Sequence, residues 1–227
     1  RRRAISAPQS PGEMAPMERR FGVFSLALFM AATALPAYAD SDFGKRLSEA
    51  AIERTQHRVA YDPSYVIIPY PGGDVADGRG VCSDVVIRSY RALGVDLQQL
   101  VHEDMAANFS VYPSLWGLSR PDTNIDHRRV PNLETFFTRR GARKALSASP
   151  KDFEPGDIVA WNLRGDAGFL PHIGVVTDRV GVSGWPLVVH NIGGGPKLED
   201  VLFAWPMTGH YRYEGEPAPA ALPGAAR

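Results

Sequence analysis

Cysteine is nearly absent from this sequence: its 227 residues contain one, Cys82. A single cysteine excludes an internal disulfide, which is the usual use of cysteine in exported proteins. Cys82 is therefore either a small hydrophobic residue of the core or a reactive thiol.

The sequence also lacks an excess of either charge, with 25 basic and 25 acidic side chains. Residues 1–39 hold five arginines and two glutamates, which leaves 20 basic and 23 acidic side chains in the remainder. A general nucleic-acid binder would show a basic excess or a basic stripe, so we expect no nucleic-acid partner. The hydrophobic content of 44% fits one globular domain with appendages.

An apolar run long enough to span a membrane comfortably is missing as well. The longest lies in "MERRFGVFSLALFMAATALPAYAD" (17–40), which is typical of a secretory signal peptide. Arg19 and Arg20 form its positive start, and "AYA" (37–39) supplies the small residues that a signal peptidase recognises. The alternative is a short membrane anchor, although about 15 apolar residues would span poorly. No cysteine stands directly after the cleavage site, which excludes a lipid-modified cysteine anchor.

We therefore expect an exported protein, periplasmic or secreted, without a stable membrane anchor once the signal peptide at residues 17–39 is removed. Residues 1–16 do not begin with Met, and we interpret them as an over-extended start ahead of Met17. The folded domain is expected over residues 40–214. The Pro/Ala-rich tail at 215–227 is expected to be disordered.

Apolar residues at helical spacing predict several helices in the first part of the domain. A helix begins at or near Cys82, because the preceding "GRG" cannot easily extend it backward, and Gly94 marks its end. The other expected helices cover residues 40–56, 95–109 and 133–141.

The second part of the domain has short β-branched and aromatic stretches separated by Gly, Pro and Asp, which predict a short antiparallel sheet. A short strand is also expected in an earlier loop, at "YVII" (65–68). Helices followed by strands indicate an α+β domain in which the helix after Cys82 packs on the sheet. The expected strands cover residues 156–163, 172–179, 186–193 and 209–214.

Three features could combine into a nucleophilic site. The free N–H groups and the dipole of a helix N-terminus favour a thiolate at Cys82. His172, at the head of a strand, could pair with that thiolate and later protonate a leaving amine. On the next strand, His190 or Asn191 could accept the ring N–H of His172. Adjacent strand residues point to opposite faces, so only one of these two neighbours can face His172.

Three blocks of sequence surround these residues: "YPGGDVADGRGVCSDVVIRSYRALG", "EPGDIVAWNLRGDAGFLPHIGVVTDR" and "PLVVHN". In this order they resemble the blocks of the NlpC-type cell-wall peptidases, which are papain-like cysteine enzymes. Over the whole domain the chain is similar to the bacterial domain-of-unknown-function family numbered 1287. The stretches that carry this similarity are "RGVCSDVV", "NIDHRRVPNL", "HIGVV" and "VVHNIG".

The resemblance implies a papain-like (NlpC-type) core, an amide bond in peptidoglycan peptides as the substrate, and no cofactor. By position it makes Cys82 the nucleophile, His172 the base, and His190 the third member, with Asn191 as the alternative. Tyr70 matches the family's tyrosine, whose hydroxyl lies near the oxyanion and helps to position substrate. The backbone N–H of Cys82 would be the other oxyanion donor.

The chain departs from this family at two places. Asp84 stands where glycine is usual, and its carboxylate suits the helix dipole but could raise the thiol pKa. Residues 95–150 form an insertion, in which His127 could line the substrate groove and Arg128 or its neighbour could bind a peptide carboxylate. The more ordinary alternative is a loop held by local hydrogen bonds and by a pair between Asp126 and an arginine.

Other interpretations stay open. Cys82, His172 and His190 are zinc-ligand types, but no two lie at close-ligand spacing and no fourth ligand is evident, so we expect no metal. A thiol acyltransferase on the same fold is one alternative function. Another is a non-catalytic cell-wall-binding protein in which Cys82 is buried and unreactive. Trp116 and Trp161 are expected in the core, although Trp116, in a Pro-rich loop, could wall a cleft.

Overall fold

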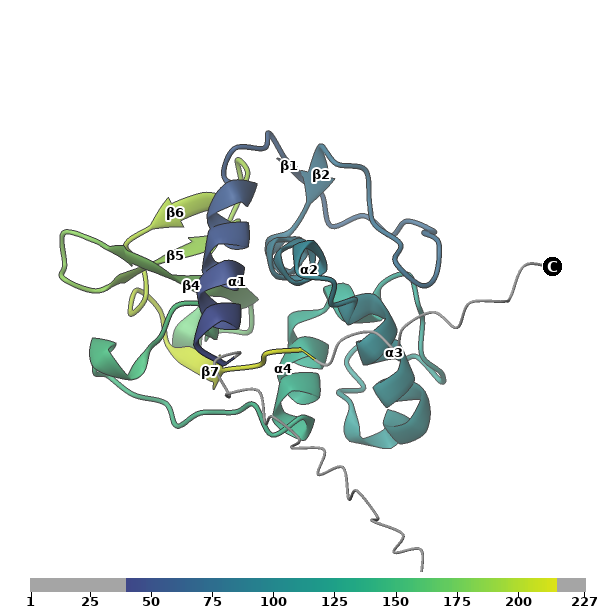
Figure 1. The fold of residues 1–227 in the computed structure, drawn as a ribbon. Helices are drawn as coiled ribbons and strands as arrows, with labels where there is room; N and C mark the ends of the chain where they lie inside the picture. Colours follow the sequence, from purple (N-terminus) through teal and green to yellow (C-terminus); the bar gives the residue numbers. More distant parts are fainter. Residues whose placement is uncertain (1–39, 216–227) are drawn as a thin grey trace, which may run out of the picture. The chain divides into compact units, whose positions relative to one another are not determined.

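The computed structural model describes residues 40–215, with side chains from residue 43 onward (Figure 1). The expected start, signal peptide and nearly all of the expected tail lie outside the described residues. The elements in chain order are α1 (Asp40–Arg54), β1 (Ala60–Tyr61), β2 (Arg79–Gly80), α2 (Cys82–Ala92), α3 (Leu97–Asn108), η1 (Phe109–Val111), η2 (Asp126–Arg128), α4 (Val130–Arg139), η3 (Pro150–Asp152), β3 (Ile158–Asn162), η4 (Gly165–Ala167), β4 (Pro171–Val180), β5 (Pro186–His190), β6 (Lys197–Glu199) and β7 (Met207–Tyr211).

A five-stranded antiparallel sheet forms the second part of the domain, in the order β6-β5-β4-β3-β7. The strands β3 to β6 follow one another as a meander, and β7 returns to pair with β3 on its free side. The register places Trp161 opposite His172, and Gly174 opposite His190. This arrangement confirms the predicted α+β class, with helices in the first half and an antiparallel sheet in the second.

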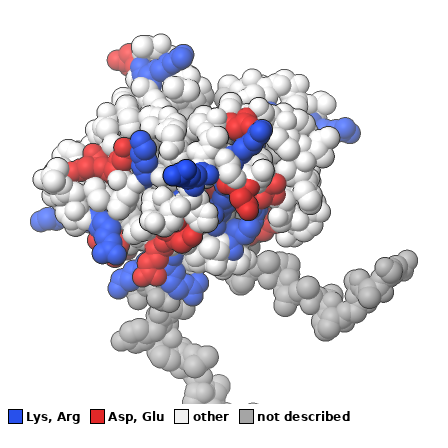
Figure 2. Space-filling model, turned by 90° about the horizontal axis from the view of Figure 1, so that it is seen from above, with Lys and Arg blue, Asp and Glu red and all other residues white. Residues whose placement is uncertain are grey.

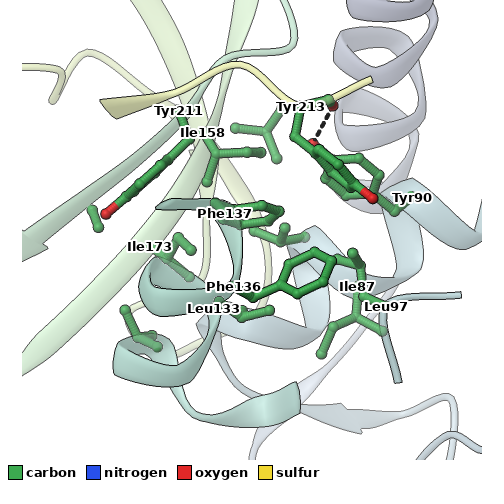
Figure 3. Close-up of a cluster of buried hydrophobic side chains, with 14 of the residues drawn as sticks. Ile87, Tyr90, Leu97, Leu133, Phe136, Phe137, Ile158, Ile173, Tyr211 and Tyr213 are labelled. Carbon is green, nitrogen blue, oxygen red and sulfur yellow. Dashed lines mark hydrogen bonds between the residues drawn. The ribbon is translucent and has the colours of Figure 1, made fainter. Parts of the chain in front are cut away.

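Helices α1 and α2 contact each other and both pack on β4 (Figure 1). Along β4 the residues Ile173 and Val175 point to this helical side, where they join the larger of the two cores. Aromatic rings fill the centre of that core (Figure 3). Within it the Tyr90 hydroxyl donates to the carbonyl oxygen of Tyr213 at 2.7 Å, so its one polar atom is satisfied.

The opposite face of the sheet has a smaller core that the β6–β7 connection and η3 help to cover. Trp161 is fully buried there, and its Nε1 donates to the carbonyl of Leu202 at 3.0 Å. The expectation that Trp161 belongs to the core is therefore confirmed. The buried hydrophobic residues of this smaller core are Phe153, Val159, Trp161, Val176, Val188 and Leu202.

The 95–150 segment adds helices beside α2. Asp96 caps α3, because its side chain accepts from the backbone N–H of Gln98 at 3.0 Å. The fully buried Gln98 donates to the carbonyls of Pro69 and Thr123, at 2.9 and 3.0 Å. One buried amide thus fixes two loops against α3.

The structure differs from the sequence expectations at its short strands. Residues 65–68 form no strand, and the backbone N–H of Ile68 instead donates to Asn124 Oδ1 at 3.0 Å. The three-residue strand β6 and the parallel pair β1–β2 were not predicted. None of the helices in the described part of the chain is both long and apolar enough to cross a membrane.

Candidate active site

Cys82 is the first residue of α2, as predicted. Val81 precedes it in extended conformation, and its backbone N–H donates to Asp84 Oδ2 at 2.6 Å. This is one half of a capping box, since a valine side chain cannot supply the other half. Asp84 therefore helps to define where the helix begins, and its negative charge lies in the first turn, where the helix dipole favours it.

Cys82 is only 4% exposed, and burial raises the pKa of its thiol to about 11. The backbone N–H of Ile173, then that of Ser83 and the Tyr61 hydroxyl, pull the pKa down, whereas the Asp84 charge raises it. Burial affects the thiol pKa more than the helix terminus does, because a buried thiolate loses more hydration free energy than the helix dipole supplies. The prediction that the helix terminus holds a thiolate is therefore wrong for this state, and the thiol is protonated at neutral pH.

His172 and His190 lie side by side on the face of the sheet that carries the smaller core, where both rings contact Trp161. Nε2 of His172 and Nδ1 of His190 are 2.8 Å apart, and each residue is 1% exposed. Nε2 of His190 in turn lies 2.8 Å from Glu199 Oε2. That contact is close but lies outside hydrogen-bond geometry. The three residues form a continuous chain of polar groups from inside the sheet to its edge.

Strand pairing explains why the two imidazoles meet. His190 pairs with Gly174, two residues along from His172 on the same face of β4. A Cβ at Gly174 would come within 2.7 Å of Val188 Cγ1 and 3.2 Å of the His190 Cβ. The spacing His-X-Gly thus leaves room for a second histidine on the neighbouring strand. Trp161 stacks on the His172 ring at 5.8 Å between centroids.

Burial lowers the pKa of His172 to about 3, and the neighbouring His190 adds to this effect. Burial also lowers the pKa of His190, against the opposing influence of Glu199. Both rings are therefore neutral at neutral pH. With His172 Nε2 engaged by His190, its Nδ1 has no hydrogen-bond partner among the residues that the structure describes.

Cys82 lies beside the backbone of β4, at the residue that follows His172. Side chains alternate along a strand, and Ile173 packs in the core that contains Cys82 while His172 stacks on Trp161 on the other face. The thiol lies near the N–H of Ile173, the residue that follows His172. Within residues 43–215, no hydrogen bond joins the sulfur to the imidazole. The structure brings the two histidines together but does not pair either of them with Cys82.

Asn191 does not face His172. Its Oδ1 accepts from the backbone N–H of Gly193 at 3.1 Å, and the residue lines a water-sized cavity beside α2 with Asp84 and Arg88. Of the two alternatives that the sequence left open, His190 is the one in contact with His172.

Tyr61, rather than Tyr70, lies beside the thiol. Tyr70 is 40% exposed and meets the His102 ring edge-on at 4.9 Å, on α3. The Tyr61 hydroxyl interacts with Cys82, and burial raises the pKa of Tyr61 to about 12. The placement of Tyr70 near the oxyanion is therefore wrong. The two-residue parallel pairing that sets Tyr61 opposite Gly80 leaves no periodic signal by which the sequence could have shown this.

Arg128 is bound inside the protein and cannot grip a substrate carboxylate. Its Nε and Nη2 each lie 2.9 Å from an oxygen of Asp84, and the two side chains are 2% and 4% exposed. Nη2 and Nη1 also approach the carbonyls of Asp62 and Ser64, at 3.4 and 3.5 Å. Arg128 thus ties the start of α2 to η2 and to the chain that follows β1. The prediction of a substrate-binding role for Arg128 is wrong, because Asp84 occupies its bidentate face.

His127 is also held within the fold. It is 2% exposed, and burial lowers its pKa to about 4. The predicted place of His127 on the wall of a substrate groove is not seen. The ordinary alternative describes this segment better, since Arg129 Nη1 lies 2.9 Å from Asp126 Oδ1.

Charge gives little indication of a partner. On the face drawn in Figure 2, basic and acidic side chains are interspersed. In the described part of the chain, no group of three or more His, Cys, Asp and Glu side chains could hold a metal ion.

The fold and the site together define an α+β domain with one cysteine at a helix start and a buried histidine pair on the neighbouring strands. The chain belongs to the family described as "Domain of unknown function (DUF1287)", which matches residues 48–213. It is 58% identical over 167 residues to "Uncharacterized protein YijF" of Escherichia coli (strain K12). That match covers 74% of this chain and 80% of the relative.

Solved structures with partial similarity include NlpC1 and NlpC2 from Trichomonas vaginalis, at 17% and 15% identity and a TM-score of 0.42 each. Each match covers 75% of this chain, which spans less than half of those proteins, 44% and 46%. An N-acetylmuramoyl-L-alanine amidase from Bacteroides uniformis matches at 12% identity and a TM-score of 0.40, covering 75% of this chain and 97% of that one. At these low TM-scores we draw no functional argument from the overlaps.

Proposed function

We propose that the chain is an exported thiol hydrolase that cleaves an amide bond in the peptide part of the bacterial cell wall. The observation that carries this proposal is the 2.8 Å bond between His172 and His190, one residue along β4 from the peptide N–H beside Cys82. A buried histidine with one nitrogen held by a second group has the orientation that a general base requires. The sequence resemblance to NlpC-type enzymes and the signal-like N-terminus support the choice of substrate and export.

In this proposal, His172 Nδ1 accepts the thiol proton as the Cys82 sulfur attacks the substrate carbonyl. A neutral thiol and a neutral imidazole favour proton transfer during attack over a preformed ion pair. The backbone N–H of Cys82 and the Tyr61 hydroxyl would donate to the oxyanion. His172 then protonates the leaving amine as the C–N bond breaks. Finally it takes a proton from the water that hydrolyses the thioester and returns one to the departing sulfur.

This chemistry requires an adjustment, because no hydrogen bond joins the Cys82 sulfur to the His172 imidazole in the described residues. Pro171 and His172 are the first two residues of the strand. A shift of this strand end would bring Nδ1 within reach of the sulfur. The Nε2 contact with His190 would guide that movement. We expect substrate to favour the rearranged state, since apo geometry is often looser than the reactive geometry.

The test uses protein produced from the full chain, incubated with purified muropeptides and read by mass spectrometry. New fragments are expected from the wild type and from His102→Gln, a matched control on α3, but not from Cys82→Ala or His172→Gln. The fragment masses name the bond. If the products carry a small amine such as glycinamide where hydrolysis would have added water, the protein is instead a thiol acyltransferase.

A non-catalytic cell-wall-binding protein is the second candidate. It is favoured by the 4% exposure of Cys82 and by the raised thiol pKa. On this alternative, wild type and Cys82→Ala bind isolated cell walls equally and release no fragments. The native thiol also resists alkylation at neutral pH. Rapid alkylation without fragments would retain a thiol enzyme and reject the cell-wall substrate.

A further inference from the structure

Glu199 lies at the outer end of the chain of polar groups that begins at His172, and no step of the proposed reaction uses it. Strand β6 places Glu199 opposite Val188 of β5, two residues before His190. Opposite residues of an antiparallel pair share a face of the sheet, and so do alternate residues of one strand, so Glu199 and His190 point to the same side. The Glu199 side chain is 37% exposed, and its Oε2 lies 2.8 Å from Nε2 of the fully buried His190 side chain.

This carboxylate oxygen distinguishes between the two tautomers of His190. A neutral imidazole has one N–H and one bare nitrogen, and either nitrogen can carry the proton. Burial lowers the pKa of His190 even beside Glu199, so the ring is neutral at neutral pH. A carboxylate oxygen only accepts, and at 2.8 Å it would repel the lone pair of a bare Nε2. It attracts an N–H there although the contact lies outside hydrogen-bond geometry, so the proton belongs on Nε2.

The tautomer of His190 then determines that of His172. With its proton on Nε2, His190 presents a bare Nδ1 to Nε2 of His172 at 2.8 Å. A hydrogen bond needs a donor, so His172 must carry its own proton on Nε2. Burial lowers the pKa of His172 to about 3, so this ring is neutral as well and its Nδ1 is bare. A bare ring nitrogen is the atom with which a histidine base accepts a proton.

We propose that Glu199 is a positioning residue that sets the tautomers of both histidines. Its carboxylate holds the proton of His190 on Nε2, and His190 in turn holds the proton of His172 on Nε2. Nδ1 of His172 is thereby the nitrogen that takes the thiol proton. The His172 cation formed in that step donates from Nε2 to His190, and the negative charge of Glu199 offsets its positive charge. The effect on the rate rests on the proposed function, whereas the tautomers themselves do not.

NMR of the ring nitrogens measures the tautomers directly. Protein produced from the full chain is isotopically labelled at its histidine nitrogens, and long-range proton–nitrogen spectra at neutral pH distinguish a protonated ring nitrogen from a bare one. The signals of each ring are identified by their loss in His172→Gln and in His190→Gln. We expect both rings to carry their proton on Nε2. A proton on Nδ1 of either ring, alone or together with one on Nε2, would overturn the proposal.

Two variants test whether Glu199 sets these tautomers. The amide of Glu199→Gln both donates and accepts, and the ammonium of Glu199→Lys only donates, so neither requires a proton on Nε2 of His190. We expect the nitrogen signals of His190 to move towards those of the other tautomer, and those of His172 to move with them. Lys197→Gln is the matched control, because Lys197 lies on the same strand opposite His190, and it should leave both rings unchanged. Unchanged signals in both Glu199 variants, or an equal change in the control, would overturn the proposal.

Muropeptide cleavage adds a functional measurement. Glu199→Gln should lower kcat about tenfold with little change in KM, a part of the roughly hundredfold to ten-thousandfold that a general base contributes. Glu199→Asp keeps the carboxylate and should recover part of the loss. If the wild type releases no fragments, the proposed function fails, and the nitrogen spectra still decide the tautomers. If the wild type and Glu199→Gln cleave equally fast, the positioning role of Glu199 is overturned while the proposed function stands.

Discussion

The ion pair between Arg128 and Asp84 should be the most sensitive polar contact at the start of α2. Replacing Arg128 by Met keeps most of the side-chain length but leaves the 4% exposed carboxylate of Asp84 without its bidentate partner. Losing one partner of a buried pair costs about 3–5 kcal/mol. Asp84 keeps its 2.6 Å bond from the N–H of Val81, so we expect the lower end, about 3 kcal/mol.

Urea unfolding at pH 7, followed by circular dichroism, measures this loss. Arg79→Met is the matched control, because Arg79 pairs with Asp62 at 2.9 Å with side chains 63% and 21% exposed. An exposed pair of this kind is worth less than about 1 kcal/mol. The double variant Arg128→Met/Asp84→Asn removes both charges. It should be more stable than the sum of the two single losses predicts.

The stability losses of Arg128→Met and of the control Arg79→Met are compared to test whether burial strengthens the ion pair. If Arg128→Met lowers the free energy of unfolding no more than Arg79→Met does, burial does not strengthen this pair and the reasoning fails. Additive single losses in the double variant would show that the two side chains are not coupled.

Three further predictions concern titration. Burial lowers the folded-state pKa of His127 to about 4 from its ordinary 6.5, so the unfolded chain binds the extra proton between these values. The free energy of unfolding should therefore fall as pH drops from 6.5 towards 4, and His127→Gln should reduce this slope by up to about 1.4 kcal/mol per pH unit. Asp84→Asn should lower the pKa of the Cys82 thiol, since the Asp84 charge raises it, and iodoacetamide rates measured against pH would register the shift. Tyr61→Phe should raise that pKa, because the Tyr61 hydroxyl stabilises the thiolate; an unchanged rate profile would contradict the contact.

The regular elements were predictable because each has a strong local pattern. The helix that begins at Cys82 and the strand that carries His172 both appear where apolar periodicity and glycine punctuation placed them. The sequence also limited the partner of His172 to His190 or Asn191, and strand pairing decides for His190.

Long-range pairing was not predictable from the sequence. Tyr61 reaches the thiol through a two-residue parallel pairing, which has no periodicity to detect. Arg128 meets Asp84 across 44 positions of sequence. A lone arginine in a polar loop gives no sign of whether it will bind a substrate or a buried carboxylate.

The short pair of strands β1 and β2, whose Tyr61 lies beside the thiol, has a consequence for the rate at which Cys82 can be labelled. Only two residue pairs, Ala60 with Arg79 and Tyr61 with Gly80, hold β1 against β2 beside Cys82. So short a pairing can open without unfolding the sheet. The labelling rate of the native thiol then equals its intrinsic rate multiplied by the opening equilibrium constant, provided that closing is fast. A weak urea dependence of that rate would identify a local opening, and the single cysteine would report on this segment alone.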